Sequence, residues 1–212
     1  MDLSNKFDAV ACVTPEAVKR LNPNRMSVEV LLGPMFAGKS SAILRMVNRY
    51  KCLGWPICII SHSADNRYSK EDLLMNHDSM GVPCVKLSEL TRHIHDKEFT
   101  DAKLVIIDEA QFFPDLKEFV VYCADVCKKD VLVVGLDGDA DRKPFGQILE
   151  CIPLADTVHK LKAFCKRCGD GTEAIFSYCS QKKTEQVCVG GAEMYMPLCR
   201  KHYNEGMKDS SV

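Results

Sequence analysis

The chain contains 212 residues, enough for one full domain and a small additional one, because domains usually comprise roughly 100–200 residues. Its 28 basic and 29 acidic residues nearly balance, which argues against a nucleic-acid coat protein or a polybasic membrane binder. No run of 18 apolar residues occurs, and residues 1–25 lack the apolar segment of a secretory signal. We therefore expect a cytoplasmic protein with reduced thiols, in which some of the 12 cysteines bind metal.

Four short apolar runs predict buried strands, at residues 28–32, 57–60, 104–107 and 131–134. Nearly continuous Val, Ile and Leu favour a parallel sheet that is covered on both faces. Apolar residues at spacings of three and four predict helices from Ser41 to Leu53 and from Leu116 to Lys129. The alternation of strands and helices indicates βαβ units and an α/β core.

A phosphate-binding loop follows the first predicted strand. Its residues, Gly33-Pro34-Met35-Phe36-Ala37-Gly38-Lys39-Ser40, match G-x-x-x-x-G-K-[ST] and precede the first predicted helix. Such a loop directs successive backbone N–H groups at one anion, and the helix N-terminus adds a favourable dipole. We predict that Lys39 contacts the β- and γ-phosphates of a nucleotide and that Ser40 ligates Mg²⁺. A chance glycine-rich turn is the alternative.

Two carboxylates, Asp108 and Glu109, follow the strand at residues 104–107. P-loop proteins hold Mg²⁺ with a carboxylate at the end of such a strand, a role that suits Asp108. A neighbouring like charge raises the pKa of a carboxyl group, so Glu109 is a candidate general base. Alternatively, Glu109 is a solvated charge, and Asp137 is a rival for the metal or substrate contact.

Two C-x-x-[CH] pairs, Cys165/Cys168 and Cys199/His202, predict a closed Cys₃His zinc site. The residues after Leu161 contain no long amphipathic helix, and structural zinc can contribute on the order of 10 kcal/mol to folding. Two chance pairs of core cysteines, or a redox pair, are the alternatives.

These patterns divide the chain into four parts. We expect a flexible arm at 1–25, a nucleotide-binding core at 26–161, a zinc-binding domain at 162–204 and a mobile tail at 205–212. The predicted fold is α/β: a P-loop NTPase-like parallel sheet flanked by helices, with a small C-terminal zinc-bound lasso or ribbon domain.

Further motifs accompany the P-loop and the metal ligands: Asp65-Asn66-Arg67-Tyr68, Asp108-Glu109-Ala110-Gln111-Phe112-Phe113, Gly135–Gly138, Arg142–Gly146 and Gly190-Gly191-Ala192. Together they make the chain, from about Val28 to Tyr203, resemble the zinc-containing type II thymidine kinases. The resemblance implies ATP- and Mg²⁺-dependent phosphorylation of the 5′-hydroxyl of thymidine, and of deoxyuridine as well, in nucleoside salvage for DNA synthesis. It also implies a homotetramer and feedback inhibition by thymidine triphosphate.

The resemblance assigns roles to individual residues. It implies that Glu109 is the general base, that Asp108 and Gln111 belong to the ATP and Mg²⁺ site, and that Asp65, Asn66 and Arg67 approach the triphosphate. The implied nucleoside pocket consists of Met35, Phe112, Leu136, Ala140, Phe145 and Tyr195, with a lasso whose backbone reads the base at Gln186, Val187, Cys188, Val189 and Gly190.

Ala140 departs from the family pattern, which usually has an aromatic residue at this place. An aromatic contact contributes about 0.5–1.5 kcal/mol beyond its buried area. We therefore predict a roomier or weaker pocket unless another side chain, such as Phe145, fills the gap.

Two other classes of protein remain as alternatives. Asp-Glu-Ala-Gln also resembles helicase signatures, which suggests a P-loop ATPase with a zinc module that binds nucleic acid. Translocating helicases usually need a second ATPase domain, however, and the near-neutral charge disfavours polynucleotide binding. A non-enzymatic nucleotide-binding regulator is the third possibility, although intact Ser40, Asp108 and Glu109 argue against it.

Overall fold

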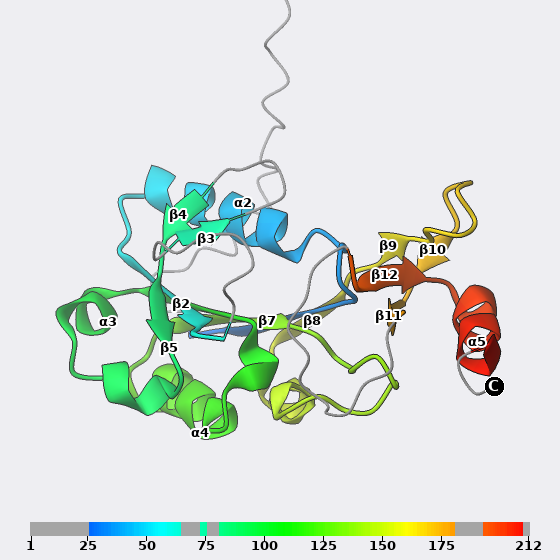
Figure 1. The fold of residues 1–212 in the computed structure, drawn as a ribbon. Helices are drawn as coiled ribbons and strands as arrows, with labels where there is room; N and C mark the ends of the chain where they lie inside the picture. Colours follow the sequence, from blue (N-terminus) through cyan, green and yellow to red (C-terminus); the bar gives the residue numbers. More distant parts are fainter. Residues whose placement is uncertain (1–25, 65–72, 76–80, 181–192, 210–212) are drawn as a thin grey trace, which may run out of the picture.

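The fold is built on a six-stranded sheet, seen in a computed structural model that describes residues 26–64, 73–75, 81–180 and 193–209 (Figure 1). The strand order is β5-β2-β6-β7-β1-β8, and every neighbouring pair is parallel. The strands are β1 (Val28–Leu32), β2 (Ile57–His62), β5 (Val85–Leu87), β6 (Leu104–Asp108), β7 (Asp130–Gly135) and β8 (Thr157–Lys160). The predicted α/β fold with a parallel sheet is therefore confirmed.

Each face of the sheet has its own hydrophobic core, because successive side chains of a strand point to opposite faces. On one face, Val131 and Val133 of β7 join a core that contains α4 (Leu116–Val121). On the other face, Leu132 and Val134 join a core that contains α2 (Lys39–Cys52). Burial on both faces explains the continuous apolar runs in the sequence, and Figure 1 shows α2 and α4 on opposite sides of the sheet.

The remaining elements of the core domain are short. They are the antiparallel pair β3 (Leu73–Met75) and β4 (Gly81–Pro83), the helix α3 (Lys97–Asp101), the π-helical turn η3 (Tyr122–Val126), and the 3₁₀ turns η1 (Leu90–His93), η2 (Ala110–Phe112) and η4 (Ile148–Leu154). The predicted helix at 116–129 is thus regular only to Val121 and ends in the π-helical turn.

The C-terminal domain consists of two antiparallel ribbons and a helix. The ribbons pair β9 (Ala163–Phe164) with β10 (Glu173–Ala174) and β11 (Phe176–Cys179) with β12 (Tyr195–Leu198), and helix α5 spans Arg200–Asp209. Its small core comprises Ala163, Cys165, Ala174, Tyr178, Leu198 and Tyr203. The helix includes residues 205–209, which the sequence analysis assigned to a tail.

Several predictions fall outside the described residues: the arm at 1–25, the residues Asp65, Asn66 and Arg67, and the lasso residues from Gln186 to Gly190. The domain boundaries stay predictions. In the part of the chain that is described, none of the helices has the length and apolarity needed to cross a membrane.

Candidate functional site

The candidate site lies where the parallel strands end, because carboxyl ends of parallel strands share one edge of a sheet. The loop 33–38 follows β1, and Asp108 and Glu109 stand at the end of β6. Strand β7 lies between β1 and β6, so the loop and the two carboxylates are separated by two strand spacings, about 10 Å. The topology therefore brings together a phosphate-binding loop and two acidic residues that are about 70 positions apart in the sequence.

The loop after β1 has the backbone that a phosphate cradle requires. Gly38 has φ 80° and directly precedes α2, whose first residue is Lys39. The Lys39 ammonium donates to the carbonyl oxygens of Gly33 (3.1 Å) and Pro34 (2.8 Å), so its charge is held inside the loop. Ser40 lies in the first turn of α2, at the helix N-terminus that favours an anion.

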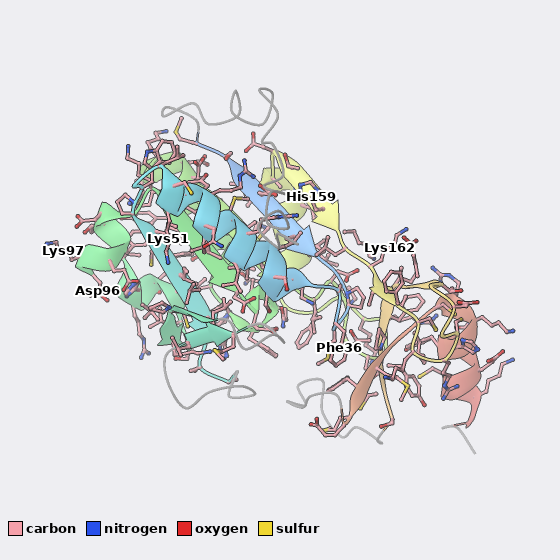
Figure 2. All side chains as sticks on the ribbon, turned by 90° about the horizontal axis from the view of Figure 1, so that it is seen from above. Phe36, Lys51, Asp96, Lys97, His159 and Lys162 are labelled. Atoms are coloured by element: carbon pink, nitrogen blue, oxygen red, sulfur yellow. The ribbon has the colours of Figure 1, made fainter. Side chains whose placement is uncertain are left out.

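The same loop is attached to the C-terminal domain. The Met35 backbone amide donates a 2.9 Å hydrogen bond to the hydroxyl of Ser177, which is buried on β11. Ala37 packs against the small core of that domain, and Figure 2 shows Phe36 between α2 and the β11–β12 ribbon. The sequence analysis missed Ser177, because no local pattern marks a serine that bonds to a residue 142 positions away.

Glu109 adopts a strained backbone conformation at the end of β6. Its φ of 51° and ψ of 40° lie in the left-handed region, which costs a residue with a side chain about 1–2 kcal/mol. Its carboxylate accepts a 2.6 Å hydrogen bond from the Gln111 side-chain amide. Asp108 beside it is buried. Strain of this kind persists where the surrounding structure fixes it, commonly at functional sites.

Asp137, the rival carboxylate at the end of β7, is engaged elsewhere. Its Oδ2 lies 2.6 Å from the ammonium of Lys160 on β8. The nearby Asp139 is buried, and its Oδ1 accepts hydrogen bonds from the backbone amides of Asp141 and Lys143, both at 2.9 Å. Asp139 therefore shapes the loop at 136–146, a role that the sequence analysis did not assign.

The residues predicted to wall a nucleoside pocket form two groups. Met35, Ala140 and Tyr195 make one buried cluster, against which Leu136 and Phe36 pack. Phe112 and Phe145 form an edge-to-face pair with ring centroids 5.3 Å apart. Ala140 is only 5% exposed, so Met35 and Tyr195 cover it, whereas the ring of Phe145 packs on Phe112.

The four predicted metal ligands converge. The ligand atoms of Cys165, Cys168, Cys199 and His202 all lie within 4.8 Å of one another. The two sulfurs of Cys168 and Cys199 are 3.8 Å apart, and the three sulfurs lie 3.3–3.6 Å from His202 Nδ1. A tetrahedral zinc site, with Zn–S of about 2.3 Å and Zn–N of about 2.1 Å, requires ligand separations of about 3.6–3.8 Å. The cluster therefore fits zinc in size and in donor type.

The surroundings of the cluster also suit a metal. Burial by itself raises the pKa of Cys165, but hydrogen bonds, among them a 3.3 Å bond from the Cys199 backbone amide, lower it to about 6. The second ring nitrogen of His202 lies 3.8 Å from a Glu205 carboxylate oxygen. This separation is an ion-pair distance, longer than the hydrogen bond by which carboxylates orient metal-bound histidines. With all four positions provided by the protein, the cluster has the ligand set that closed structural zinc sites use.

Comparison with known proteins identifies the family. Residues 26–203 match the family model described as "Thymidine kinase". The chain belongs to the thymidine kinase family. It is 44% identical to a thymidine kinase from Oryza sativa over 184 residues, which cover 84% of this chain and 66% of the rice protein.

Other thymidine kinases match at similar levels. Thymidine kinase a of Arabidopsis thaliana is 43% identical over 84% of this chain and 74% of its own. The thymidine kinase of Vaccinia virus (strain Ankara) is 39% identical over 83% of this chain and 96% of its own. The chain thus spans just under two thirds of the rice protein but nearly all of the viral one. The resemblance inferred from the motifs is confirmed, and family membership supports the phosphorylation of thymidine with ATP.

Proposed function

We propose that the chain transfers the γ-phosphoryl group of ATP to the 5′-hydroxyl of thymidine, with Glu109 as the general base. One observation carries the proposal: the phosphate-binding loop after β1 and the pair Asp108–Glu109 after β6 share one edge of the sheet. Membership of the thymidine kinase family supports the choice of substrates.

The residues at this edge have complementary tasks. Backbone N–H groups of the loop 33–38, apart from Pro34, which has none, and Met35, which donates to Ser177, would bind the phosphates of ATP together with the Lys39 ammonium. Ser40 and Asp108 would hold Mg²⁺. When bound, Mg²⁺ neutralises the charge of the transferring phosphate. Phosphoryl transfer depends mainly on positioning and charge neutralisation, and these residues provide both.

The transfer itself needs one proton acceptor. The 5′-oxygen of thymidine forms a bond to the γ-phosphorus while the bond from that phosphorus to the bridging oxygen of ADP breaks. Glu109 accepts the proton that the hydroxyl loses, and ADP leaves with the electron pair of the broken bond. General-base catalysis of this kind contributes about 10²–10⁴-fold to the rate.

The nucleoside would lie against Met35, Leu136, Ala140 and Tyr195, with Phe112 and Phe145 at one side. The clustering of the first four side chains supports this placement. The backbone of residues 186–190, outside the described part of the chain, would read the base edge. Deoxyuridine differs from thymidine by one methyl group, which is worth about 1–3 kcal/mol of discrimination, so we include it as a second substrate.

The Cys₃His cluster would bind one structural zinc ion per chain. Its donor types and ligand separations support this assignment. By joining the residues that follow β9 to the end of β12 and the start of α5, the metal would fix the domain that contacts the P-loop through Ser177. The small core of that domain, with six buried apolar side chains, makes such support necessary.

Family resemblance supports three finer proposals. We infer a homotetramer, feedback inhibition by thymidine triphosphate, and a cytoplasmic location. The ten cysteines in the described residues are all free, in keeping with a reducing compartment. Light scattering of the purified protein, and thymidine kinetics with added thymidine triphosphate, test the first two.

A nucleoside panel tests the activity. Purified protein with ATP and Mg²⁺ is offered thymidine, deoxyuridine, deoxycytidine and deoxyguanosine, and the 5′-monophosphates are measured. We expect turnover of thymidine and deoxyuridine. ATP hydrolysis that responds to polynucleotide instead would indicate the nucleic-acid-dependent ATPase, and the absence of any turnover would indicate a nucleotide-binding regulator.

Glu109→Gln tests the base. This variant should keep ATP binding but lose kcat by a factor of about 10² or more. Asp137→Asn is the matched control, because Asp137 follows the neighbouring strand β7 and pairs with Lys160. It should retain kcat within a few-fold. A normal kcat in Glu109→Gln would remove Glu109 as the base.

A further inference from the structure

The side-chain amide of Gln111 bridges two elements of the site. Its Nε2 donates a 2.6 Å hydrogen bond to Glu109 Oε2, and its Oε1 accepts a 2.9 Å hydrogen bond from the Leu136 backbone amide. A backbone N–H can only donate, so it requires the amide oxygen, which leaves the NH₂ group directed at the carboxylate. The orientation of the amide is therefore fixed by chemistry.

Gln111 has almost no freedom to move. Its side chain is buried, with 3% of the residue exposed. Its backbone is equally enclosed: a Cβ at Gly146, where φ is +57°, would lie 2.0 Å from the Gln111 carbonyl oxygen. Only glycine allows the loop at 136–146 to approach η2 this closely. The amide donor is therefore presented to Glu109 from a rigid position.

Glu109, in contrast, has a long and only partly buried side chain. Ordering such a side chain costs rotamer entropy. A short, charge-assisted hydrogen bond from a fixed donor offsets this cost and selects one rotamer. Through its amide oxygen, Gln111 also connects the Glu109 side chain to the backbone of Leu136, the first residue after β7.

We propose that Gln111 is a positioning residue, which holds the Glu109 carboxylate in the place from which it receives the proton of the nucleoside hydroxyl. This inference rests on the proposed role of Glu109. It gives Gln111 a role different from the expected one in the ATP and Mg²⁺ site, and the observed contacts that support it are one bond from the amide nitrogen and one to the amide oxygen.

A role in positioning Glu109 and a role in binding ATP predict different kinetic changes when Gln111 is replaced. Gln111→Met keeps the length of the side chain but removes both the donor and the acceptor. As a positioning residue, Gln111 should lose kcat by about 10- to 100-fold in this variant, since misplacing a catalytic group by about 1 Å can cost 10²-fold. The KM values for ATP and thymidine should stay within about threefold of wild type. A raised KM for ATP with normal kcat would overturn the inference and make Gln111 a nucleotide ligand.

Gln111→Glu separates the two hydrogen bonds. The new carboxylate still accepts from the Leu136 amide, but it repels Glu109 instead of donating to it. We expect kcat to fall as in Gln111→Met, whereas a purely structural tie to Leu136 would leave kcat near wild type. This isosteric variant also keeps the test valid if Gln111→Met does not fold.

Gln147→Met is the matched control. Gln147 also uses both ends of its amide, accepting from the Lys117 amide (3.0 Å) and donating to the Pro114 carbonyl (2.7 Å), but its hydrogen bonds lie away from Glu109. This variant should lose stability and keep kcat. A loss of kcat equal to that of Gln111→Met would assign the effect to general loosening of the fold and overturn the inference.

A double-mutant cycle with Glu109→Gln distinguishes this inference from the proposed function. If Gln111 acts through Glu109, adding Gln111→Met to Glu109→Gln should change kcat by less than about twofold. Additive losses would show that Gln111 acts independently and would overturn the inference alone. A normal kcat in Glu109→Gln by itself would instead overturn the proposed role of Glu109.

Discussion

The hydroxyl of Tyr203 donates a 2.5 Å hydrogen bond to the carbonyl oxygen of Ala140. Tyr203 is fully buried and follows His202 of the Cys₃His cluster on α5, while Ala140 lies on the loop at 136–146. The Arg142 guanidinium from the same loop lies over the Tyr203 ring, 4.7 Å from its centroid. The C-terminal domain thereby fixes the loop at 136–146, which would contact the nucleoside.

Tyr203→Phe should therefore weaken thymidine binding. The change leaves the buried Ala140 carbonyl without its donor, which costs about 1–3 kcal/mol of stability. We expect the KM for thymidine to rise several-fold while the KM for ATP changes little, measured by steady-state kinetics together with urea unfolding. Tyr178→Phe is the control, because Tyr178 donates to the Gly206 carbonyl within the C-terminal domain. Equal kinetics in both variants would contradict the coupling of Tyr203 to the loop.

Ala140→Phe tests whether the site has spare room. Because Ala140 is covered by Met35 and Tyr195, a ring at this position has to displace them, and overpacking typically costs about 1–3 kcal/mol. We expect a higher KM for thymidine and a lower melting temperature. A lower KM with unchanged melting temperature would show that the pocket is roomy, as expected from the missing aromatic residue at position 140. An unchanged KM would separate Ala140 from the nucleoside altogether.

Removing one metal ligand should unfold the small domain. Cys168→Ser is expected to reduce the zinc content from one per chain to near zero and to lower the melting temperature, because the domain has only a small core. Metal analysis and thermal unfolding measure both effects. Cys52→Ser, at an exposed position on α2, should change neither. An active, stable Cys168→Ser protein without zinc would rule out the structural role.

The thiols of Cys52 and Cys58 should differ in reactivity. Burial, and to a lesser extent the charge of Glu98, raises the pKa of Cys58 to about 12. Relative to a free thiol of pKa about 8.5, its thiolate fraction at pH 8 falls about 10³-fold, and it stays protonated until the pH approaches 12. Peptide mapping after iodoacetamide treatment should show rapid labelling of the exposed Cys52 and labelling of Cys58 only after unfolding. Comparable rates in the native protein would contradict the buried position of Cys58.

Apolar runs in the sequence predicted the central strands of the sheet. Strand β1 at Val28–Leu32 has the predicted bounds, β6 extends one residue beyond its prediction at one end, and β7 extends one residue beyond its prediction at each end. The edge strands β5 and β8 were missed, because three and four residues without a continuous apolar run carry little signal. The π-helical turn after α4 was also missed, since its sequence keeps the helical periodicity.

Contacts between ordinary polar residues that are distant in the sequence were beyond prediction. Ser177 bonds to an amide 142 positions away and Tyr203 to a carbonyl 63 positions away, and each is an ordinary polar residue in its own segment. Gln111 was recognised as part of a motif, but only the position of Leu136 on the neighbouring strand end shows what its amide contacts.

The sequence by itself determined the family, the motif of the phosphate-binding loop and the four residues of the Cys₃His cluster, because each depends on residue types at fixed short spacings. Only the tertiary structure decided how Glu109 is held, what covers Ala140 and how the C-terminal domain contacts the P-loop. These relationships arise where the parallel strands end side by side, and strand order is set by long-range packing rather than by spacing along the chain.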